Sequence, residues 1–218
     1  MKTFFYHARS WALACAVFAA FLPASWASGD RPNPATDSVI LVATEALVDP
    51  VYAQSVLIAR PAANGMHVGI ILNKQTPITL ATLFPAHEPS KGVKDNVFFG
   101  GPMTSNAIAA VIQKYPGEGQ KGVIEFTKDL YMVLSSDAID AIIESAPNDA
   151  RYYVGNVIWR PGELAMELDK GMWTVLPVSN EIVFRQNTSG LWKLLNEDSK
   201  LLYTGMPVPA TVLALLLR

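Results

Sequence analysis

A short apolar stretch that stops abruptly constrains this chain more than any other feature. The run Val97-Phe98-Phe99 leads directly into Gly100-Gly101-Pro102. Three consecutive apolar residues predict a short buried strand. Two glycines permit backbone angles that other residues avoid, and a proline fixes φ and lacks an amide hydrogen, so the strand must end in a turn. Side chains just before such a turn lie at the rim of a sheet, where sites are often built; the alternative is a plain strand-ending turn.

The first residues predict a leader that is removed. A weakly basic start precedes an unbroken apolar run over residues 11–22, and small side chains follow at Ser25 and Ala27. This is the layout of a secretory signal peptide with cleavage after Ala27. The run is shorter than the roughly twenty apolar residues that span a membrane, and an uncleaved anchor is the alternative. We therefore expect a signal peptide at residues 1–27, a periplasmic or secreted protein, and no transmembrane span in the mature chain.

Removal of the leader makes the chain more acidic and free of thiols. Residues 1–27 hold Lys2 and Arg9 but no acidic residue, so the net charge changes from −2 to about −4. The one cysteine, Cys15, also lies in the leader. The mature chain then has no disulfide and no thiolate metal site. It has no basic surplus with which to hold a phosphate backbone, which argues against nucleic acid as a partner.

Composition and hydrophobic periodicity divide the rest of the chain into segments. With 50% hydrophobic and 17% charged residues, the chain is globular and long enough for one well-buried domain. Residues 28–37 show no periodicity and are expected to form a flexible lead. No repeat or composition break occurs within residues 38–200, which we assign to a single domain. Residues 201–218 form an apolar tail that is too short to span a bilayer and either docks on the domain or forms a contact patch.

The apolar runs predict more strands than helices. Besides the run ending at Phe99, the predicted strands are residues 39–43, 51–59, 65–73, 123–126, 130–134, 151–159 and 172–176. Residues 103–113 are ambiguous between helix and strand.

Several capping signals predict helices. Thr79 is expected to cap a short helical turn, Ser136 to cap the clearest helix of the chain, and Pro161 to begin another. Residues 179–184 and 190–196 are predicted as short helices. Because the strands do not alternate regularly with crossover helices, the predicted fold class is α+β.

The order of these segments resembles the YqgE/AlgH family over residues 39–196. The segments that carry the resemblance are Ile40-Leu41-Val42-Ala43 with Asp49-Pro50, Gln54-Ser55-Val56-Leu57, Gly69-Ile70-Ile71-Leu72-Asn73-Lys74, Phe99-Gly100-Gly101-Pro102 and Trp159-Arg160-Pro161-Gly162-Glu163-Leu164. The chain departs from the family pattern at Arg160, where the family has Gly, and at Glu163, where it has Gln. We therefore expect a divergent member.

The resemblance implies a mixed, bifurcated β-sheet folded into a pseudo-barrel with flanking helices. It implies little about activity, since family members have been described as transcriptional regulators without a recognisable DNA-binding element. An exported, acidic member fits that description poorly.

The polar residues within the family-like segments each follow or end a predicted strand, so they are expected to converge at one rim. Structural pairing of an arginine with carboxylates is the alternative to a binding cleft. The candidate ligand-binding residues are Asp49, Asn73, Phe99, Gly100, Gly101, Pro102, Trp159, Arg160 and Glu163.

The sequence gives little support for a metal site, a cofactor site or a catalytic nucleophile. His67 is expected to be a half-exposed strand residue, and no second histidine lies at ligand spacing, so no metal is predicted. The glycines of residues 117–122 match a dinucleotide fingerprint, but Pro116 precedes them and a strand follows, so no cofactor is predicted. No nucleophile elbow is present.

The sequence leaves three functions open. The first is a non-enzymatic exported module that binds a small molecule or a protein. The second is a hydrolase-type enzyme that uses Asp49 or Glu163 as acid or base and Arg160 as an anion clamp. The third is DNA-linked regulation, which the family description suggests and which charge and export oppose.

Overall fold

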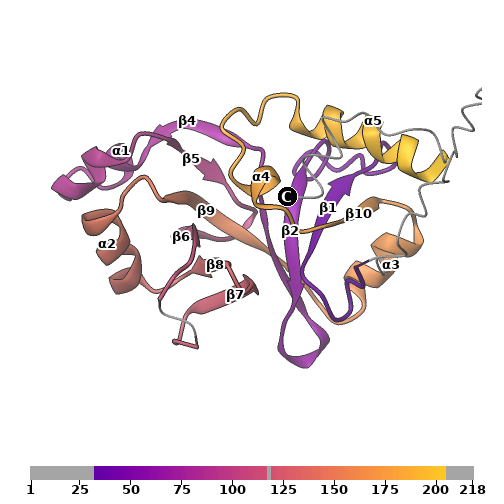
Figure 1. Ribbon diagram of the computed structural model, residues 1–218, viewed down its shortest axis with the longest axis horizontal. Coiled ribbons are helices and arrows are strands. Elements are labelled where there is room, and N and C mark those ends of the chain that lie inside the picture. Colours follow the sequence, from indigo (N-terminus) through magenta and orange to yellow (C-terminus); the bar gives the residue numbers. More distant parts are fainter. Residues whose placement is uncertain (1–31, 117–118, 205–218) are drawn as a thin grey trace, which may run out of the picture. The chain divides into compact units, whose positions relative to one another are not determined.

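One long strand, β9 (Ala150–Trp159), takes part in both halves of the sheet and organises the fold (Figure 1). The computed structural model describes residues 32–116 and 119–204, and there ten strands form one sheet. The C-terminal end of β9 pairs with one half-sheet and its N-terminal end with the other. The sheet thus divides at β9 and curls into a half-barrel, which confirms the bifurcated α+β fold that the resemblance implied.

The first half-sheet has the strand order β10-β1-β2-β3-β9, and each neighbouring pair is antiparallel. Its other strands are β1 (Val39–Ala43), β2 (Val56–Pro61), β3 (His67–Ile71) and β10 (Trp173–Pro177). A 3-10 helix, η1 (Ala63–Gly65), joins β2 to β3. All five residues of β1 are buried, as the continuous apolar run predicted.

The second half-sheet continues from β9 in the order β6-β8-β7. These strands are β6 (Met103–Gln113), β7 (Val123–Thr127) and β8 (Leu130–Val133). Two further strands, β4 (Gln75–Thr79) and β5 (Asn96–Phe99), pair with each other. Because β5 runs parallel to β9 at Phe98 and Phe99, the sheet is mixed.

Helices lie beside both halves of the sheet (Figure 1). They are α1 (Leu80–Leu83), the 3-10 helix η2 (Glu88–Gly92), α2 (Ser136–Ser145), α3 (Glu163–Asp169), α4 (Asn180–Val183) and α5 (Leu191–Thr204). The isoleucines of α2 pack on the second half-sheet, and α5 packs near β1, where the indole of Trp192 donates to the carbonyl of Ala43 at 2.6 Å.

Some local predictions were correct and others were not. The side chain of Thr79 caps α1, and residues 103–113 form a strand. The predicted strand over residues 51–59 begins only at Val56, because Asp49 closes a turn before it. The helix after Pro161 begins at Glu163, since Gly162 takes a left-handed conformation at the N-cap. Ser135, not Ser136, occupies the N-cap of α2 and makes no side-chain capping bond there.

The proposed chain boundaries lie mostly outside the part that the structure describes. The predicted leader at residues 1–27 and residues 205–218 of the apolar tail are among the residues not described, as is part of the glycine pattern at 117–122. Within the lead, residues 33–37 form a turn in which the amide of Asp37 donates to the carbonyl of Asn33 at 2.7 Å. Across residues 32–116 and 119–204, no helix has the length and hydropathy needed to cross a bilayer.

Candidate functional site

The glycine turn after β5 crosses β9 at very close range. The amide of Gly100 donates to Val154, and its carbonyl accepts from Ile71, both at 2.8 Å. A Cβ built on Gly101 would lie 2.2 Å from the carbonyl oxygen of Asn156, and one built on Gly155 would lie 2.1 Å from that of Gly101. Only glycine fits where two backbones approach this closely. The motif that first marks the sequence therefore joins β3, β5 and β9.

Asn73 and Asp49 hold the loop before β2. The side-chain oxygen of Asn73 accepts from the amide of Val56 at 2.8 Å, and its nitrogen donates to the carbonyl of Gln54 at 2.9 Å. The carboxylate of Asp49 accepts from the amide of Val51 at 2.8 Å. Both side chains thus satisfy backbone groups of one turn, which is the usual task of Asx side chains in loops.

Two tryptophans converge on one carboxylate. The indole nitrogens of Trp159 and Trp173 both donate to the same oxygen of Glu167, at 2.9 and 2.7 Å. Phe99 packs against the same apolar cluster. Glu167 was not among the predicted site residues, although it lies four residues after Glu163 on α3.

Tyr52 links the two preceding groups. Burial raises the pKa of the Tyr52 hydroxyl, and the negative charges of Asp49, Glu167 and Glu163 raise it further. The ring of Tyr52 also packs edge-on against that of Trp173, with 6.5 Å between the ring centroids. The ammonium of Lys74 donates to the carbonyl of Val51 at 2.6 Å, and burial lowers its pKa.

Arg160 is strongly exposed to solvent. Its side chain is 85% exposed and its Nε lies 4.0 Å from the carboxylate of Glu163. That carboxylate also accepts from the backbone amide of Arg160 at 2.7 Å. An exposed pair of this kind contributes little to stability. Catalysis by Asp49, Glu163 and Arg160 stays a prediction, as does ligand binding by the whole predicted set; Pro102 is exposed at the end of the glycine turn.

Residues of the first half-sheet, of α3 and of the neighbouring loops carry these contacts, and we name them the motif side: Asp49, Tyr52, Asn73, Trp159, Glu163, Glu167 and Trp173. The polar side-chain groups of Asp49, Asn73, Glu163, Glu167 and the two tryptophans bond to backbone or to one another. The motif side is therefore a network of internal contacts.

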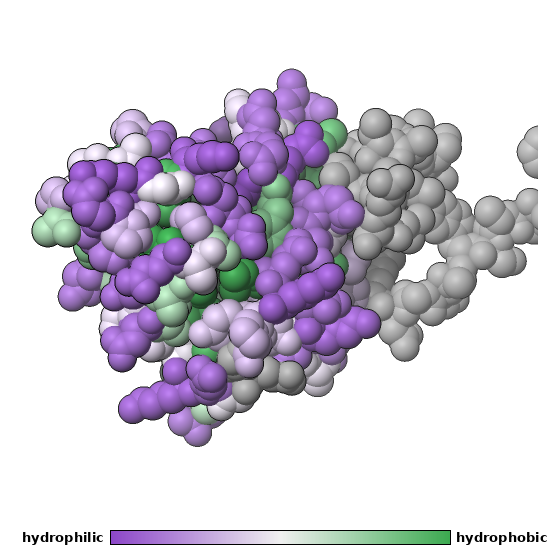
Figure 2. Space-filling model, turned by 60° about the vertical axis from the view of Figure 1, so that its left-hand side comes forward, coloured by the Kyte–Doolittle hydropathy of each residue, from purple (hydrophilic) through white to green (hydrophobic). Residues whose placement is uncertain are grey.

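Two adjoining cavities lie around β6. One cavity of about 410 Å³ lies between β6, α2 and the segment joining α1 to η2. It is lined by Phe84, His87, Asn106, Ala107, Ile108, Leu134, Ser136, Ile139, Asp140 and Ile143. In Figure 2 the side carrying α1 and α2 comes forward and shows hydrophobic atoms deep between hydrophilic ones.

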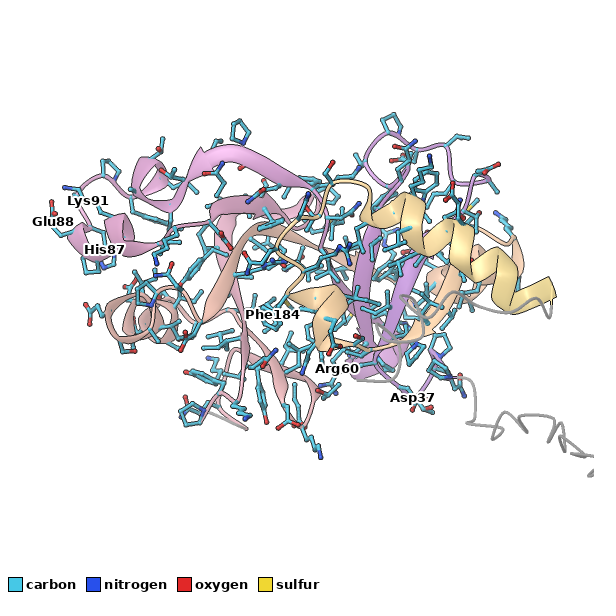
Figure 3. All side chains as sticks on the ribbon, turned by 45° about the horizontal axis from the view of Figure 1, so that its top comes forward. Asp37, Arg60, His87, Glu88, Lys91 and Phe184 are labelled. Atoms are coloured by element: carbon cyan, nitrogen blue, oxygen red, sulfur yellow. The ribbon has the colours of Figure 1, made fainter. Side chains whose placement is uncertain are left out.

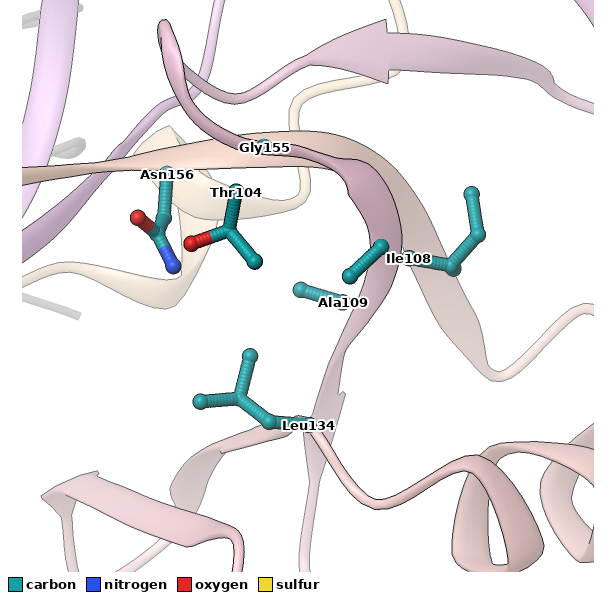
Figure 4. A pocket seen from close by; sticks show the side chains of 7 residues that line it. Thr104, Ile108, Ala109, Leu134, Gly155 and Asn156 are labelled. Carbon is teal, nitrogen blue, oxygen red and sulfur yellow. The ribbon is translucent and has the colours of Figure 1, made fainter.

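A second cavity of about 160 Å³ adjoins the first and shares Ala107, Ile108 and Leu134 with it (Figure 4). Its other lining residues are Thr104, Ala109, Gly155 and Asn156. We call the two adjoining cavities the β6 groove. Since Gly155 packs against Gly101, the glycine crossing forms one end of this groove.

Asn156 presents an unused polar atom to the smaller cavity. Its side chain is 7% exposed, and its Oδ1 accepts no hydrogen bond from any residue that the structure describes. Figure 4 shows the amide beside Thr104 at the cavity. A buried acceptor without a partner is uncommon and calls for an explanation such as a ligand or water.

Arg151 is a second buried polar group, but it serves the fold. It is 3% exposed and donates to the carbonyl of Val183 at 2.9 Å and to that of Arg185. Its guanidinium lies 5.2 Å from the ring centroid of Phe98 and 6.0 Å from that of Phe184, which Figure 3 marks near α4. Arg151 therefore fastens the α4 turn to β9 by hydrogen bonds and cation–π contacts.

His67 is half-buried in β3, as predicted, and its Nε2 contacts the carbonyl of Pro34 at 2.9 Å. In residues 32–116 and 119–204, no group of three or more His, Cys, Asp or Glu side chains is arranged to hold a metal ion.

The fold and groove define a curled α+β sheet protein with an apolar groove beside its second half-sheet. The AlgH-like family model matches residues 40–202, so this chain belongs to the AlgH-like family. A UPF0301 protein of Anaeromyxobacter dehalogenans is 27% identical over 163 residues, covering 70% of this chain and 82% of that protein. One of Cytophaga hutchinsonii is 22% identical over 161 residues, covering 72% and 86%.

Two solved structures share the fold. The solution structure of the AlgH protein from Pseudomonas aeruginosa has a TM-score of 0.61 at 19% identity and covers 84% of this chain and 96% of that one. A crystal structure of a protein from Corynebacterium diphtheriae has a TM-score of 0.58 at 22% identity, with coverage of 74% and 86%. The recognised family and its fold are thereby confirmed, and the family's members are uncharacterised proteins.

Proposed function

We propose that this protein is an exported, non-enzymatic binding module whose ligand occupies the β6 groove. The observation that carries the proposal is the pair of adjoining cavities around Ala107, Ile108 and Leu134. A concave, mainly apolar site with a few polar groups is typical of ligand binding. Here those polar groups are His87, Asp140 and the unused oxygen of Asn156.

The internal contacts of the motif side support this placement. Both polar atoms of the Asn73 amide already bond to the backbone, and Glu167 already accepts from two indoles. A ligand there would have to break bonds that the fold already makes, which costs the desolvation of each group left unpaired. A ligand in the β6 groove would instead fill cavities that are lined mainly by apolar side chains.

The probe for this proposal is N-phenyl-1-naphthylamine, a neutral apolar dye that fluoresces when it leaves water. We expect saturable fluorescence with the full chain. Ala107 is exposed and lines both cavities, so Ala107→Trp should fill their junction and weaken dye binding at least about tenfold.

The matched control is Ala141→Trp, an equal enlargement at an exposed position of α2 that lines neither cavity. It should bind the dye as the unmodified chain does. Absence of saturable binding, or equal binding by both variants, would contradict a site in the β6 groove.

Export is supported by the leader-like residues 1–27 and is tested separately. Fractionation of the native host, followed by N-terminal sequencing, should recover a chain that begins at Ser28 outside the cytoplasm. Recovery of the uncleaved chain in the cytoplasm would contradict export and leave groove binding to stand on the dye experiment.

A further inference from the structure

The N-terminal part of β6 has a free edge. On one side β6 pairs with β9 at Met103 and from Ile108 to Ile112, and the register shifts between these two parts. On the other side β8 pairs only with residues from Ala110 to Gln113. From Met103 to Ala109, therefore, no strand that the structure describes lies on the β8 side. Residues 104–107 form an irregularity that pairs with neither β8 nor β9, and Thr104 there has a φ of +51°. At Ile108 and Ala109 the strand is regular, and alternate amides and carbonyls point to the free side, so this segment has hydrogen-bonding groups to offer.

The two cavities of the β6 groove adjoin this edge, where consecutive residues of β6 belong to apolar clusters on different faces of the sheet. Ala109, at the smaller cavity, belongs to the apolar cluster that includes Val111 and Tyr153. Ile108 packs against the cluster under α2, which also supplies Ile139 and Ile143 to the larger cavity. Figure 4 shows the side chains of Ile108 and Ala109 pointing to opposite sides of β6.

This arrangement matches what an added strand requires. Successive side chains of a strand point to opposite faces, so two consecutive residues of an added strand would reach one cavity each. The cavities of about 160 and 410 Å³ would take a small and a large apolar side chain respectively. Recognition of an extended peptide at a sheet edge combines main-chain hydrogen bonds with such alternating pockets.

The charged residues beside the groove indicate which kind of peptide would bind there. The exposed side of α2 carries Asp137, Asp140 and Glu144, none of which forms an ion pair with a described residue. On the opposite side of the groove, the ammonium of Lys91 is paired with Glu88 at 2.6 Å, and Figure 3 shows both beside His87 at η2. The carboxylate that lines the larger cavity is that of Asp140, which favours a basic group of a ligand beside it.

Building on groove binding as the protein's function, we propose that an extended peptide segment of a partner protein adds to the edge of β6 at residues 103–109. A small apolar residue enters the cavity at Asn156, the next residue is large and enters the cavity under α2, and a basic residue two positions later lies beside Asp140. A backbone amide of the peptide or a bound water can donate to Oδ1 of Asn156. A second copy of this chain fits less well, since it would bring its own acidic α2 to the same rim.

The test uses the full chain and a fluorescein-labelled probe, Ser-Val-Leu-Thr-Lys-Ser-amide, followed by fluorescence anisotropy. We expect saturable binding at physiological salt and competition with N-phenyl-1-naphthylamine. The same peptide N-methylated at Leu and Lys keeps every side chain but lacks two amide donors, and it should bind at least about tenfold more weakly if it pairs with the edge. Equal binding of the methylated peptide would overturn strand addition.

Two variants test the charge. Asp140→Asn should weaken binding of the peptide by about three- to fivefold, because one partly exposed charge pair is removed. At high salt the two chains should bind the peptide equally. Asp137→Asn, on the same helix but outside both cavities, should bind within about twofold of the unmodified chain. Equal effects of the two variants would contradict the placement of the basic residue.

The outcomes separate this inference from the proposed function. Dye binding that is sensitive to Ala107→Trp, with no peptide competition, would overturn the peptide inference and uphold the groove. If neither the dye nor the peptide binds, both the proposed function and the peptide inference are overturned. Formation of a dimer that Ala107→Trp abolishes, seen by sedimentation without peptide, would show a second copy to be the occupant and would also overturn the peptide inference.

Discussion

The motif side and the β6 groove differ in how their polar groups are used. On the motif side, side chains such as Asn73 and Glu167 each accept or donate two hydrogen bonds within the chain. Around the groove, Asn156 is buried with an unused oxygen and the edge of β6 has no described partner over residues 103–109. The comparison teaches that recognisable residues of this sequence bond within the chain, while the cavities around β6 lie beside a segment with little sequence signal.

The largest effect is expected where the two regions meet. Gly155→Ala places a Cβ 2.1 Å from the carbonyl oxygen of Gly101 at a φ of +74°, so the glycine crossing must open. We expect the free energy of unfolding to fall by at least about 4 kcal/mol, or no folded protein. The control is Gly190→Ala, with a φ of +75° and no described atom within 4 Å of the new Cβ, which should cost about 1–2 kcal/mol. Equal losses in urea denaturation would show that the close crossing is not what requires glycine.

On the motif side, Asn73→Leu should destabilise the fold strongly. The change leaves the amide of Val56 and the carbonyl of Gln54 without their side-chain partner. We expect a loss of about 2–4 kcal/mol in the free energy of unfolding. Asn73→Asp, which keeps the acceptor for Val56 but loses the donor, should be intermediate. A loss below about 0.5 kcal/mol for the leucine variant would mean that these contacts are not what holds the turn.

The same substitution in the groove should behave differently. Asn156→Leu removes an amide whose oxygen has no described partner, and leucine has a similar volume. Replacement of an unsatisfied polar group by an apolar one is nearly neutral or stabilising, so we expect a change within about 1 kcal/mol. Chemical denaturation of both variants side by side gives the comparison directly. A loss as large as that of Asn73→Leu would erase the contrast between the two regions.

The smallest effect is a dependence on pH at Tyr52. Burial first, and then Asp49, Glu167 and Glu163, raise the pKa of this hydroxyl above its ordinary 10.0. The folded chain then keeps a proton that the unfolded chain loses, so this contribution is fully present below pH 10 and is lost as the pH rises through the higher, folded pKa. Above pH 10 the free energy of unfolding should fall more steeply for the unmodified chain than for Tyr52→Phe. Parallel profiles above pH 10 would contradict the raised pKa.

Much of the fold could be predicted from the sequence, because it depends on local hydrophobic periodicity and on capping and turn residues. The apolar run of β1, the Thr79 cap and the isoleucine stripe of α2 all identified their elements. The strand β4 was missed because Gln75–Thr79 is polar and holds Pro77, so neither periodicity nor composition marks it. The resemblance supplied the bifurcated sheet, which local patterns alone do not specify.

The location of open space could not be predicted. The sequence predicted Asp49 and Glu163 on a common rim, and the structure has Asp49 in the turn before β2 and Glu163 at the start of α3. Nothing in the sequence shows that Asn156 is buried without a partner or that β8 stops short of Ala109, since both follow from the register of strands distant in sequence. Residues 103–113, which form β6, were themselves predicted only ambiguously, as helix or strand.

The most direct test is to locate bound N-phenyl-1-naphthylamine by amide chemical-shift mapping of the full chain. Occupation of the β6 groove predicts that the largest shifts fall on Ala107, Ile108, Leu134 and Ile139. Largest shifts on Asp49, Asn73, Arg160 and Glu163, with the groove unchanged, would place the site on the motif side and contradict the account.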